Sequence, residues 1–281
     1  MSGRYVAICV ALAALALVPA VATVADAPFY TGLFARIMVF AIAAVSLDLI
    51  LGYGGLVSFG HAALAALVIG FVSLRTSGVY FIMITLAFGQ MVYFVAIGLN
   101  EYGGDDGLNI ARHSDFGAAL NLDRPVVFYY FAYGLLLLFL FLGNRIVQSR
   151  FGMLLQGVKS NERRMIALGF PTFRYKLTAF VMAGAVCGIA GALFANLTLF
   201  VSPSIMHWTR SGEIMMMVIL GGLGSLVGPV FGAAAYLILE SVLSRLTEHW
   251  QAVLGPILIL VVLFSKTGLY GIFALPRRRS G

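Results

Sequence analysis

Ionisable side chains within apolar segments are the residues of this sequence with the clearest potential for chemistry. Asp48 and His61 lie on either side of a glycine-rich break, and Glu213 begins a second apolar region that glycine also interrupts. Charged groups are costly in a bilayer and often mark a substrate or ion pathway, although each could also cap a helix or form an interhelical hydrogen bond. Arg36 and Glu240 lie near helix ends, where long side chains can reach the membrane interface.

Motifs for catalysis are missing from the sequence. The glycine-rich stretches lack the Gly-Lys-Ser/Thr ending of a nucleotide-binding loop, and neither a serine-hydrolase elbow nor a His-Glu-x-x-His zinc motif occurs. The four histidines and the two cysteines, Cys9 and Cys187, have no metal-ligand or redox spacing. We therefore expect a non-enzymatic chain with no catalytic residue, metal or cofactor, which does not hydrolyse ATP itself.

Composition places these residues in a lipid bilayer. The chain is 61% hydrophobic and 10% charged, with a mean hydropathy of +1.00, which soluble domains do not reach. The apolar runs are continuous rather than alternating, so helices are expected and not a β-barrel. The sequence predicts an all-α polytopic integral membrane protein, with a single transmembrane domain over residues 1–276 and a short basic cytoplasmic tail over 277–281. The net charge of +7 fits cytoplasmic loops, and no nucleic-acid partner is expected.

Six apolar runs are predicted as full membrane spans, because each approaches or exceeds the roughly 20 residues that cross a bilayer. They are Tyr5–Val24, Leu33–Leu51, Val79–Leu99, Val126–Gly143, Leu177–Leu197 and Trp250–Phe273. The first run could be a signal peptide, but it exceeds the usual apolar core of about 7–15 residues, which favours an uncleaved helix. Two further regions, Gly52–Leu74 and Gly212–Leu243, are predicted as glycine-broken pairs of short helices or as re-entrant segments.

Loop charge predicts the orientation of the chain. Residues 100–124 carry five acidic and two basic side chains, whereas residues 144–176 carry seven basic and one acidic side chain. Arg277, Arg278 and Arg279 add positive charge near the C-terminus. By the positive-inside rule, residues 144–176 and the C-terminus are cytoplasmic and residues 100–124 are outside. This orientation requires each glycine-broken region to enter and leave the membrane on the same side.

The two glycine-broken regions share a short sequence pattern. Residues 54–58 read GGLVS and residues 221–225 read GGLGS. Paired helices broken by glycine in two halves are typical of repeat-built transporters, although chance similarity between glycine-rich segments is the alternative. The candidate residues of a translocation path are Asp48, Gly54, Gly55, Ser58, His61, Glu213, Gly221, Gly222 and Ser225.

The stretch VKSNERRMIALGFP, residues 158–171, gathers charge within the basic loop. As a helix it would place Glu162, Met165, Ile166 and Gly169 on one side, with Arg163 and Arg164 in water. Asn161 is expected to cap the helix start, and Gly169 with Pro171 to end it. The pattern indicates a contact surface for a partner, with an ordinary basic loop as the alternative.

Six ordered blocks of the sequence resemble branched-chain amino acid ABC importer permeases of the LivM type. The blocks are SRFGMLLQGVKSNERRMIALGFPTFRYKLTAFVMAGAVCGIAGALFA (Ser149–Ala195), GYGGLVSFGHAA, GVYFIMITLAFGQ, GGDDGLN, EIMMMVILGGLGSLVGPVFGAA and LVVLFSKTGLYGIF. In that family a Glu-x-x-Ala-x-x-x-Gly segment docks on the ATPase. The resemblance maps it onto Glu162, Arg163, Arg164, Met165, Ile166, Ala167 and Gly169, with two arginines where small residues are common.

The resemblance also implies partners and a location. It implies a permease subunit in the bacterial inner membrane that pairs with a second permease subunit, two ATP-binding cassette subunits and a periplasmic solute-binding protein. The implied substrates are branched-chain or related small amino acids. Between HAALAAL and SLRTSGVYF, where relatives carry about a helix pair more, only residues 68–72 remain. The alternatives are an ion-coupled secondary carrier and a shortened relative that assembles without transporting.

Overall fold

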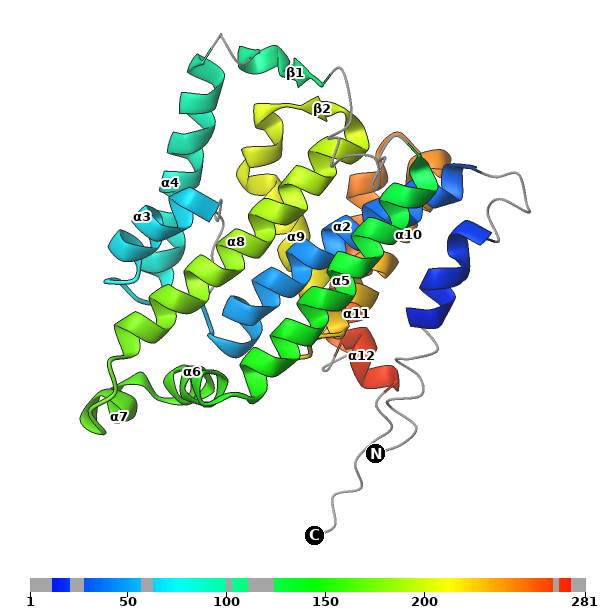
Figure 1. Ribbon diagram of the computed structural model, residues 1–281. Coiled ribbons are helices and arrows are strands. Elements are labelled where there is room, and N and C mark those ends of the chain that lie inside the picture. Colours follow the sequence, from blue (N-terminus) through cyan, green and yellow to red (C-terminus); the bar gives the residue numbers. More distant parts are fainter. Residues whose placement is uncertain are drawn as a thin grey trace.

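The computed structural model is a helical bundle in which nearly every described residue belongs to a helix or a short turn (Figure 1). The structure describes residues 12–20, 28–56, 63–99, 103–110, 124–264 and 268–273. Residues 12–20 are helical. The labelled α-helices are α2 (Pro28–Asp48), α3 (Ala63–Ser73), α4 (Val79–Gly98), α5 (Pro125–Gln148), α6 (Arg150–Ser160), α7 (Glu162–Ala167), α8 (Thr172–Thr198), α9 (Trp208–Gly221), α10 (Gly228–Leu246), α11 (Trp250–Phe264) and α12 (Gly268–Phe273). The short elements are the π-helix η1 (Leu49–Tyr53), the 3-10 helices η3 (Gly104–Asp106) and η4 (Pro203–Met206), and the strands β1 (Leu108–Asn109) and β2 (Phe200–Val201).

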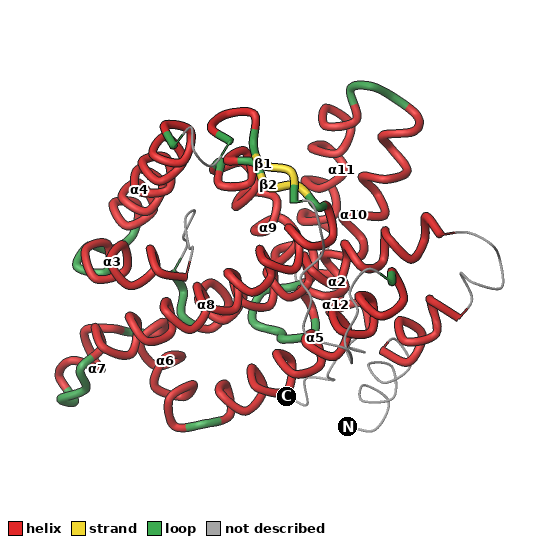
Figure 2. Tube along the Cα trace, turned by 45° about the horizontal axis from the view of Figure 1, so that its top comes forward, coloured by secondary structure: helices red, strands yellow, loops and turns green. Residues whose placement is uncertain are grey.

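Five of the described helical segments are long and apolar enough to cross a membrane, which confirms an all-α polytopic membrane protein. They are Phe29–Tyr53, Val79–Gly98, Pro125–Gln148, Thr172–Thr198 and Gly228–Leu246. The first of them forms the centre of the bundle. Of its most apolar stretch, 78% is buried inside the bundle, whereas the value for the second segment is 11%. Accordingly α2 packs against α5, α8, α9 and α10, as the tilted view in Figure 2 shows.

The N-terminal run is described only over residues 12–20, and the rest of Tyr5–Val24 lies outside the described residues. Three tyrosines of α5 hold this helix by donating hydroxyl hydrogen bonds to its carbonyls. The O···O distances are 2.5 Å from Tyr129 to Leu15 and 3.0 Å from Tyr133 to Leu12. A third hydroxyl, that of Tyr130, donates in the same way.

The first glycine-broken region forms a short helix rather than a span. The helix α3 has 11 residues, which at 1.5 Å per residue is about half the hydrocarbon thickness of a bilayer. It packs on α8 and on α4 at the edge of the bundle. A helix of this length agrees with the predicted short-helix or re-entrant form of Gly52–Leu74.

The second glycine-broken region forms a pair of antiparallel helices, and here the structure refines the prediction. The helix α9 has 14 residues, whereas α10 has 19 and is long enough to span. The pair still returns the chain to the side from which it started, as the predicted orientation requires. Gly232 allows the close pairing, because a Cβ there would lie 2.6 Å from the Gly221 nitrogen on α9.

The predicted single span Trp250–Phe273 is not one continuous helix, because α12 begins at Gly268 with a non-helical φ; residues 265–267, between α11 and α12, lie outside the described residues. Pro256 lies inside α11, which has only 15 residues. Gly268 then begins α12 in a left-handed conformation, with φ of +68°. A Cβ on Gly268 would lie 2.5 Å from the Cα of Gly222. Contact with the second glycine-rich loop therefore takes the place of a straight helix.

The two ends of the bundle carry different loops. At one end, uppermost in Figure 1, β1 pairs antiparallel with β2, matching Leu108 with Val201. The acidic residues Asp105 and Asp106 precede this pairing. At the opposite end lie α6 and α7, which hold the basic stretch. The acidic and basic loops thus lie at opposite ends of the bundle, and the basic tail over residues 277–281 lies outside the described residues.

Candidate translocation and coupling site

Asp48 links the two glycine-broken regions. It ends α2, has no exposed surface, and its Oδ1 accepts a hydrogen bond from the Gly224 nitrogen at 2.9 Å. Its other oxygen, Oδ2, is buried without a hydrogen-bond partner among the described residues. A buried carboxylate is costly unless it is hydrogen-bonded. The contact therefore assigns Asp48 a structural role as well as making it a site candidate.

The backbones of the two regions approach each other closely beside this carboxylate. A Cβ on Gly52 would lie 2.6 Å from the Gly224 nitrogen and would collide with the Asp48 carboxylate. Gly224 has φ of +76°, which side chains other than glycine rarely adopt. Both positions therefore require glycine, for contact at Gly52 and for conformation at Gly224. We call Asp48, Gly52 and Gly224 the glycine junction.

The second loop is also held by its own hydrogen bonds. The Ser225 hydroxyl donates to the Gly222 carbonyl at 2.8 Å, and the Gly228 nitrogen donates to the Ser225 carbonyl at 2.9 Å. Gly221 packs against the backbone of Gly228 and Pro229, where a side chain would not fit. Three predicted path residues, Gly221, Gly222 and Ser225, thus shape the loop that Asp48 contacts.

The first loop places Gly54 and Gly55 directly after η1. The Gly55 nitrogen donates to the Leu51 carbonyl at 3.2 Å, and Gly55 has φ of +69°. Ser58 and His61, which were also predicted to line the path, lie outside the described residues. The structure therefore brings Asp48 and Gly52 together with the second loop, and it places Gly55 against Lys159.

Lys159 connects the basic loop to the glycine junction. Its Nζ donates to the Gly52 carbonyl at 2.5 Å across 107 residues of sequence. A Cβ on Gly55 would lie 2.9 Å from the Lys159 Cγ, so the aliphatic stem packs on the first loop. Lys159 is in the last turn of α6, two residues before the cap of α7. A displacement of α7 would therefore act directly on the junction.

The helix α7 begins and ends as its sequence predicts. Asn161 is the N-cap, and its side-chain oxygen accepts a hydrogen bond from the Arg164 nitrogen at 3.0 Å. Gly169 has φ of +86°, and its nitrogen donates to the Ile166 carbonyl at 2.9 Å. The left-handed glycine then lets the Phe170 nitrogen reach the Met165 carbonyl at 3.1 Å, which closes the helix end.

Glu162 fixes α7 to the start of α8. Its Oε1 lies 2.6 Å from the Lys176 Nζ and accepts a hydrogen bond from the Thr172 hydroxyl at 3.2 Å. The Lys176 side chain is only 8% exposed and that of Glu162 is 37% exposed. The carboxylate thus neutralises a nearly buried ammonium, so Glu162 holds the loop in place from within the chain.

The surface of α7 that faces away from the bundle is apolar and basic. Ile166 is 56% exposed and Leu168 is 65% exposed, while Phe170 extends the patch. The neighbouring exposed residues are Arg163, Arg164, Ala167 and Gly169. We call Ile166, Leu168 and Phe170 the outer patch. Exposed apolar side chains gathered on a charged loop are typical of a protein contact.

Met165 turns inward instead. Its sulfur lies close to α6, since a Cβ on Gly157 would be only 3.0 Å from it. The sequence placed Met165 on the same side as Ile166. The structure separates the two, with Met165 packing α7 on α6 and Ile166 left for the outer patch.

Glu213 takes no part in the hydrogen bonds of the glycine junction described above and forms its own ion pair. On the first turns of α9, its Oε2 lies 2.9 Å from the Arg210 Nη1. Arg210 was not among the predicted site residues, and neither were Lys159 and Lys176. A spacing of three residues on one helix could have suggested the Arg210 pair. The other two contacts join separate helices or loops and leave no local signal.

The fold and this site define a class of protein: a multi-pass membrane permease component. The family described as the permease component of the branched-chain amino acid transport system matches residues 61–263, which is more than half of the chain. The chain belongs to this family.

Individual relatives agree with this assignment. The high-affinity branched-chain amino acid transport system permease protein LivM of Escherichia coli K12 is 27% identical over 268 residues, covering 79% of this chain. The LivM protein of Salmonella typhimurium LT2 is 28% identical over the same length. The chain spans 63% of the length of these relatives.

A sugar permease is also related. The L-arabinose ABC transporter permease protein AraH of Azospirillum brasilense is 27% identical over 136 residues, which is 46% of this chain and 40% of AraH. No solved structure matches the chain.

Proposed function

We propose that this chain is one permease subunit of an ATP-binding-cassette importer for branched-chain or related small amino acids in the bacterial inner membrane. The family and the two LivM relatives support this role. ATP would be hydrolysed by partner subunits, and a second permease subunit would complete the membrane part. A periplasmic solute-binding protein would deliver the substrate.

We propose further that α7 is the segment that docks on an ATP-binding subunit. The observation that carries this assignment is the Lys159–Gly52 contact, which ties α6 and α7 to the glycine junction. The Glu162–Lys176 ion pair fixes the other end of the loop to α8. With both anchors in place, a partner that moved the outer patch would move the backbone at both glycine breaks.

The orientation follows from the same assignment. An ATPase is cytoplasmic, so the end of the bundle with α6 and α7 would face the cytoplasm. The basic charge of residues 144–176 supports this orientation. The acidic end with β1 and β2 would face the periplasm, where a solute-binding protein would dock.

Co-purification tests the proposal. The tagged chain, solubilised from its native host, is expected to bring down an ATP-binding subunit and a second permease subunit. Mass spectrometry of the purified complex would identify them. Purification of the chain alone, with no ATP-binding subunit under mild detergents, would contradict the proposal.

Asp48 also favours a second candidate, an ion-coupled secondary carrier. A fully buried carboxylate, with one oxygen that has no hydrogen-bond partner among the described residues, is the kind of group that a proton or Na⁺ would occupy during transport. This candidate predicts uptake by the purified chain in liposomes under an ion gradient without any ATPase. Uptake that requires ATP on either side of the membrane and does not depend on the ion gradient would exclude the ion-coupled carrier.

A further inference from the structure

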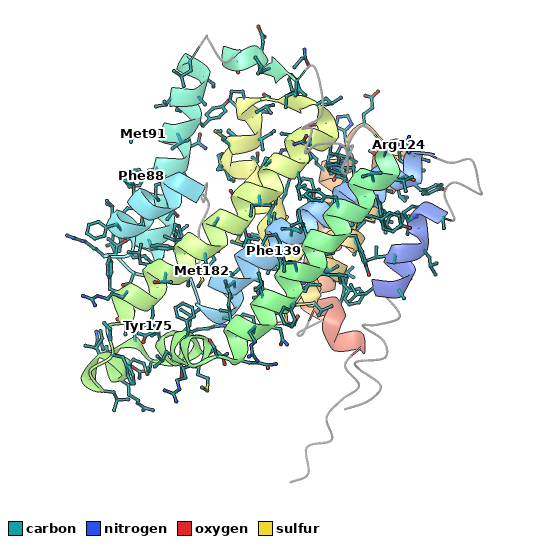
Figure 3. All side chains as sticks on the ribbon, viewed as in Figure 1. Phe88, Met91, Arg124, Phe139, Tyr175 and Met182 are labelled. Atoms are coloured by element: carbon teal, nitrogen blue, oxygen red, sulfur yellow. The ribbon has the colours of Figure 1, made fainter. Side chains whose placement is uncertain are left out.

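A cavity of about 270 Å³ lies between α2, α4, α8 and α9, about halfway along α2. Its walls are apolar, with Phe40, Phe194 and Ile214 among them, and Figure 3 marks the adjoining part of α4 with Phe88 and Met91. Among the described residues that line it, only Arg210 carries a charge. Its volume is slightly below the range of roughly 300–1,000 Å³ for drug-sized ligands, which suits a smaller molecule.

Arg210, the charged residue on the cavity wall, forms an ion pair with Glu213. Its Nη1 lies 2.9 Å from the Glu213 Oε2, one turn further along α9. That bond uses one of the five N–H donors of the guanidinium, whose planar fork suits carboxylates. Arg210 therefore lines the cavity with its negative partner directly beside it, although Glu213 is not itself a lining residue.

We propose that this cavity is a binding site, within the permease itself, for one free amino acid with an uncharged, apolar side chain. Arg210 would bind the α-carboxylate, Glu213 would bind the α-ammonium, and the side chain would enter the apolar cavity. This inference rests on the proposed function and locates its substrate site. It implies that the membrane subunit selects its substrate independently of a solute-binding protein.

Charge complementarity singles out the zwitterion. A free amino acid carries both charges on one carbon, so it can exchange the Arg210–Glu213 bond for two charge-assisted hydrogen bonds without leaving either group unpaired. A simple amine or a simple carboxylate would satisfy one group and leave the other, which is partly buried, without its charged partner. A lipid chain would fill the walls but use neither charge.

The position of the pair also connects it to the glycine junction. Arg210 and Glu213 lie near the start of α9, and the same helix ends at Gly221, directly before the loop that Asp48 holds. Binding of the ligand to Arg210 and Glu213 would therefore act on α9, the helix that leads to the glycine junction.

Equilibrium binding tests the inference directly. The full-length chain, with the subunits that co-purify, is placed in nanodiscs without solute-binding protein and titrated with radiolabelled L-leucine. Unlabelled leucine is expected to compete at least about tenfold better than isoamylamine or 4-methylpentanoate, each of which lacks one charge. Equal competition by either analogue would overturn the assignment of the two charges.

Matched neutralisations separate ligand binding from ion-pair stability. Arg210→Gln with Glu213→Gln is expected to weaken leucine binding about 10- to 100-fold. The control, Arg36→Gln with Glu240→Gln, removes an ion pair of 3.2 Å between α2 and α10 that does not line this cavity. It is expected to leave leucine binding within about threefold. Similar losses in both double variants would contradict the inference.

Cavity size gives an independent readout that does not touch the charges. A Cβ on Gly191, which lines the cavity, meets no described atom within 4 Å, so Gly191→Leu can fold while filling the space. It is expected to weaken leucine binding at least about tenfold and alanine binding much less. Gly134→Leu on α5, where a Cβ also meets nothing described within 4 Å, is the control. Unchanged leucine binding in Gly191→Leu would overturn the site.

The outcomes also separate this inference from the proposed function. If the complex shows ATP-dependent uptake but neither the double neutralisation nor Gly191→Leu alters the affinity for leucine, the importer stands and this site is wrong. If leucine binds with the predicted pattern but no ATP-binding subunit associates, the site stands and the importer assignment is wrong.

Discussion

Asp48 and Gly224 are joined by a 2.9 Å hydrogen bond between the carboxylate Oδ1 and the backbone nitrogen, across 176 residues of sequence. Asp48 ends the central helix, and Gly224 lies in the loop between α9 and α10. The bond fixes two interrupted segments against each other at the end of the bundle that carries the basic loop. Lys159 then joins that loop to the same point through the Gly52 carbonyl.

Removal of the Asp48 acceptor should weaken this junction. Asp48→Leu leaves the Gly224 N–H without its partner, which we expect to cost about 1–3 kcal/mol of unfolding free energy. Asp48→Asn keeps a carbonyl oxygen at the same place and is expected to retain most of the stability. Thermal unfolding of the purified variants in detergent checks this order. Equal midpoints for the leucine variant and the unsubstituted chain would contradict it.

Gly52 should not tolerate any side chain. In Gly52→Ala the new methyl group would meet the Asp48 carboxylate and the Gly224 nitrogen, at 2.6 Å from the latter. We expect a loss of at least about 2 kcal/mol, as for other overpacked sites. Gly32→Ala on α2, in the same membrane span, is the control, because a Cβ there meets no described atom within 4 Å. Comparable thermal midpoints for both variants would show that the close approach is wrong.

Lys159 should matter for coupling more than for stability. Lys159→Met removes the hydrogen bond to Gly52 but keeps the aliphatic stem that packs on Gly55. In the reconstituted complex we expect ATP hydrolysis to continue while substrate uptake falls at least about fivefold, since the link between loop and junction is lost. Arg150→Met, which removes a positive charge from the same helix, should leave the ratio of uptake to hydrolysis unchanged. An unchanged ratio of uptake to hydrolysis in Lys159→Met would show that the Lys159–Gly52 bond does not couple the loop to the junction.

The Glu162–Lys176 pair should show unequal single variants. Glu162→Gln leaves the nearly buried Lys176 ammonium without its counter-charge, whereas Lys176→Met leaves Glu162 with partial access to water and its bond to Thr172. We expect the glutamine variant to be more destabilised, by about 1–2 kcal/mol, because unpaired buried charges are costly and this pair is partly exposed. A double-mutant cycle measures the interaction. Additive single effects would mean that the pair contributes nothing.

The outer patch should control partner binding without affecting the fold. Ile166→Glu with Leu168→Glu places charges on side chains that are already 56% and 65% exposed. We expect normal thermal stability and at least about a tenfold loss of bound ATP-binding subunit in pull-downs. Leu246→Glu, at the opposite end of the bundle and 78% exposed, is the control. Retention of the ATP-binding subunit by the double variant would exclude the patch as its docking surface.

Much of the architecture follows from local sequence. Hydropathy predicted four of the five described spans, α10 being the exception, and side-chain chemistry predicted both ends of α7 at Asn161 and Gly169. The repeated glycine pattern covers residues 54–58 and 221–225, and the residue that meets Gly224 beside Asp48 is Gly52, two positions before the first copy. In each case the signal lies within a few residues, because apolar length, capping and left-handed backbone are local properties.

The contacts that join these elements did not follow from the sequence. Lys159 and Gly52 are 107 residues apart, and their bond depends on how α6 packs under η1. Gly268, at the start of α12, packs closely on Gly222 of the second glycine-rich loop, a contact that no periodic pattern records. Helix packing in lipid relies on close fit rather than on hydrophobic contrast, so partner choice leaves a weak trace in composition.

In the proposed importer, ATP hydrolysis by a bound subunit would drive amino acid import through this chain. Uptake of radiolabelled L-leucine into proteoliposomes that contain the purified complex, with solute-binding protein outside and ATP supplied on the ATPase side, tests it most directly. We expect uptake that requires both ATP and the solute-binding protein. The double variant Ile166→Glu with Leu168→Glu is expected to abolish this uptake. Leucine uptake by the chain alone, driven by an ion gradient without ATP, would contradict it.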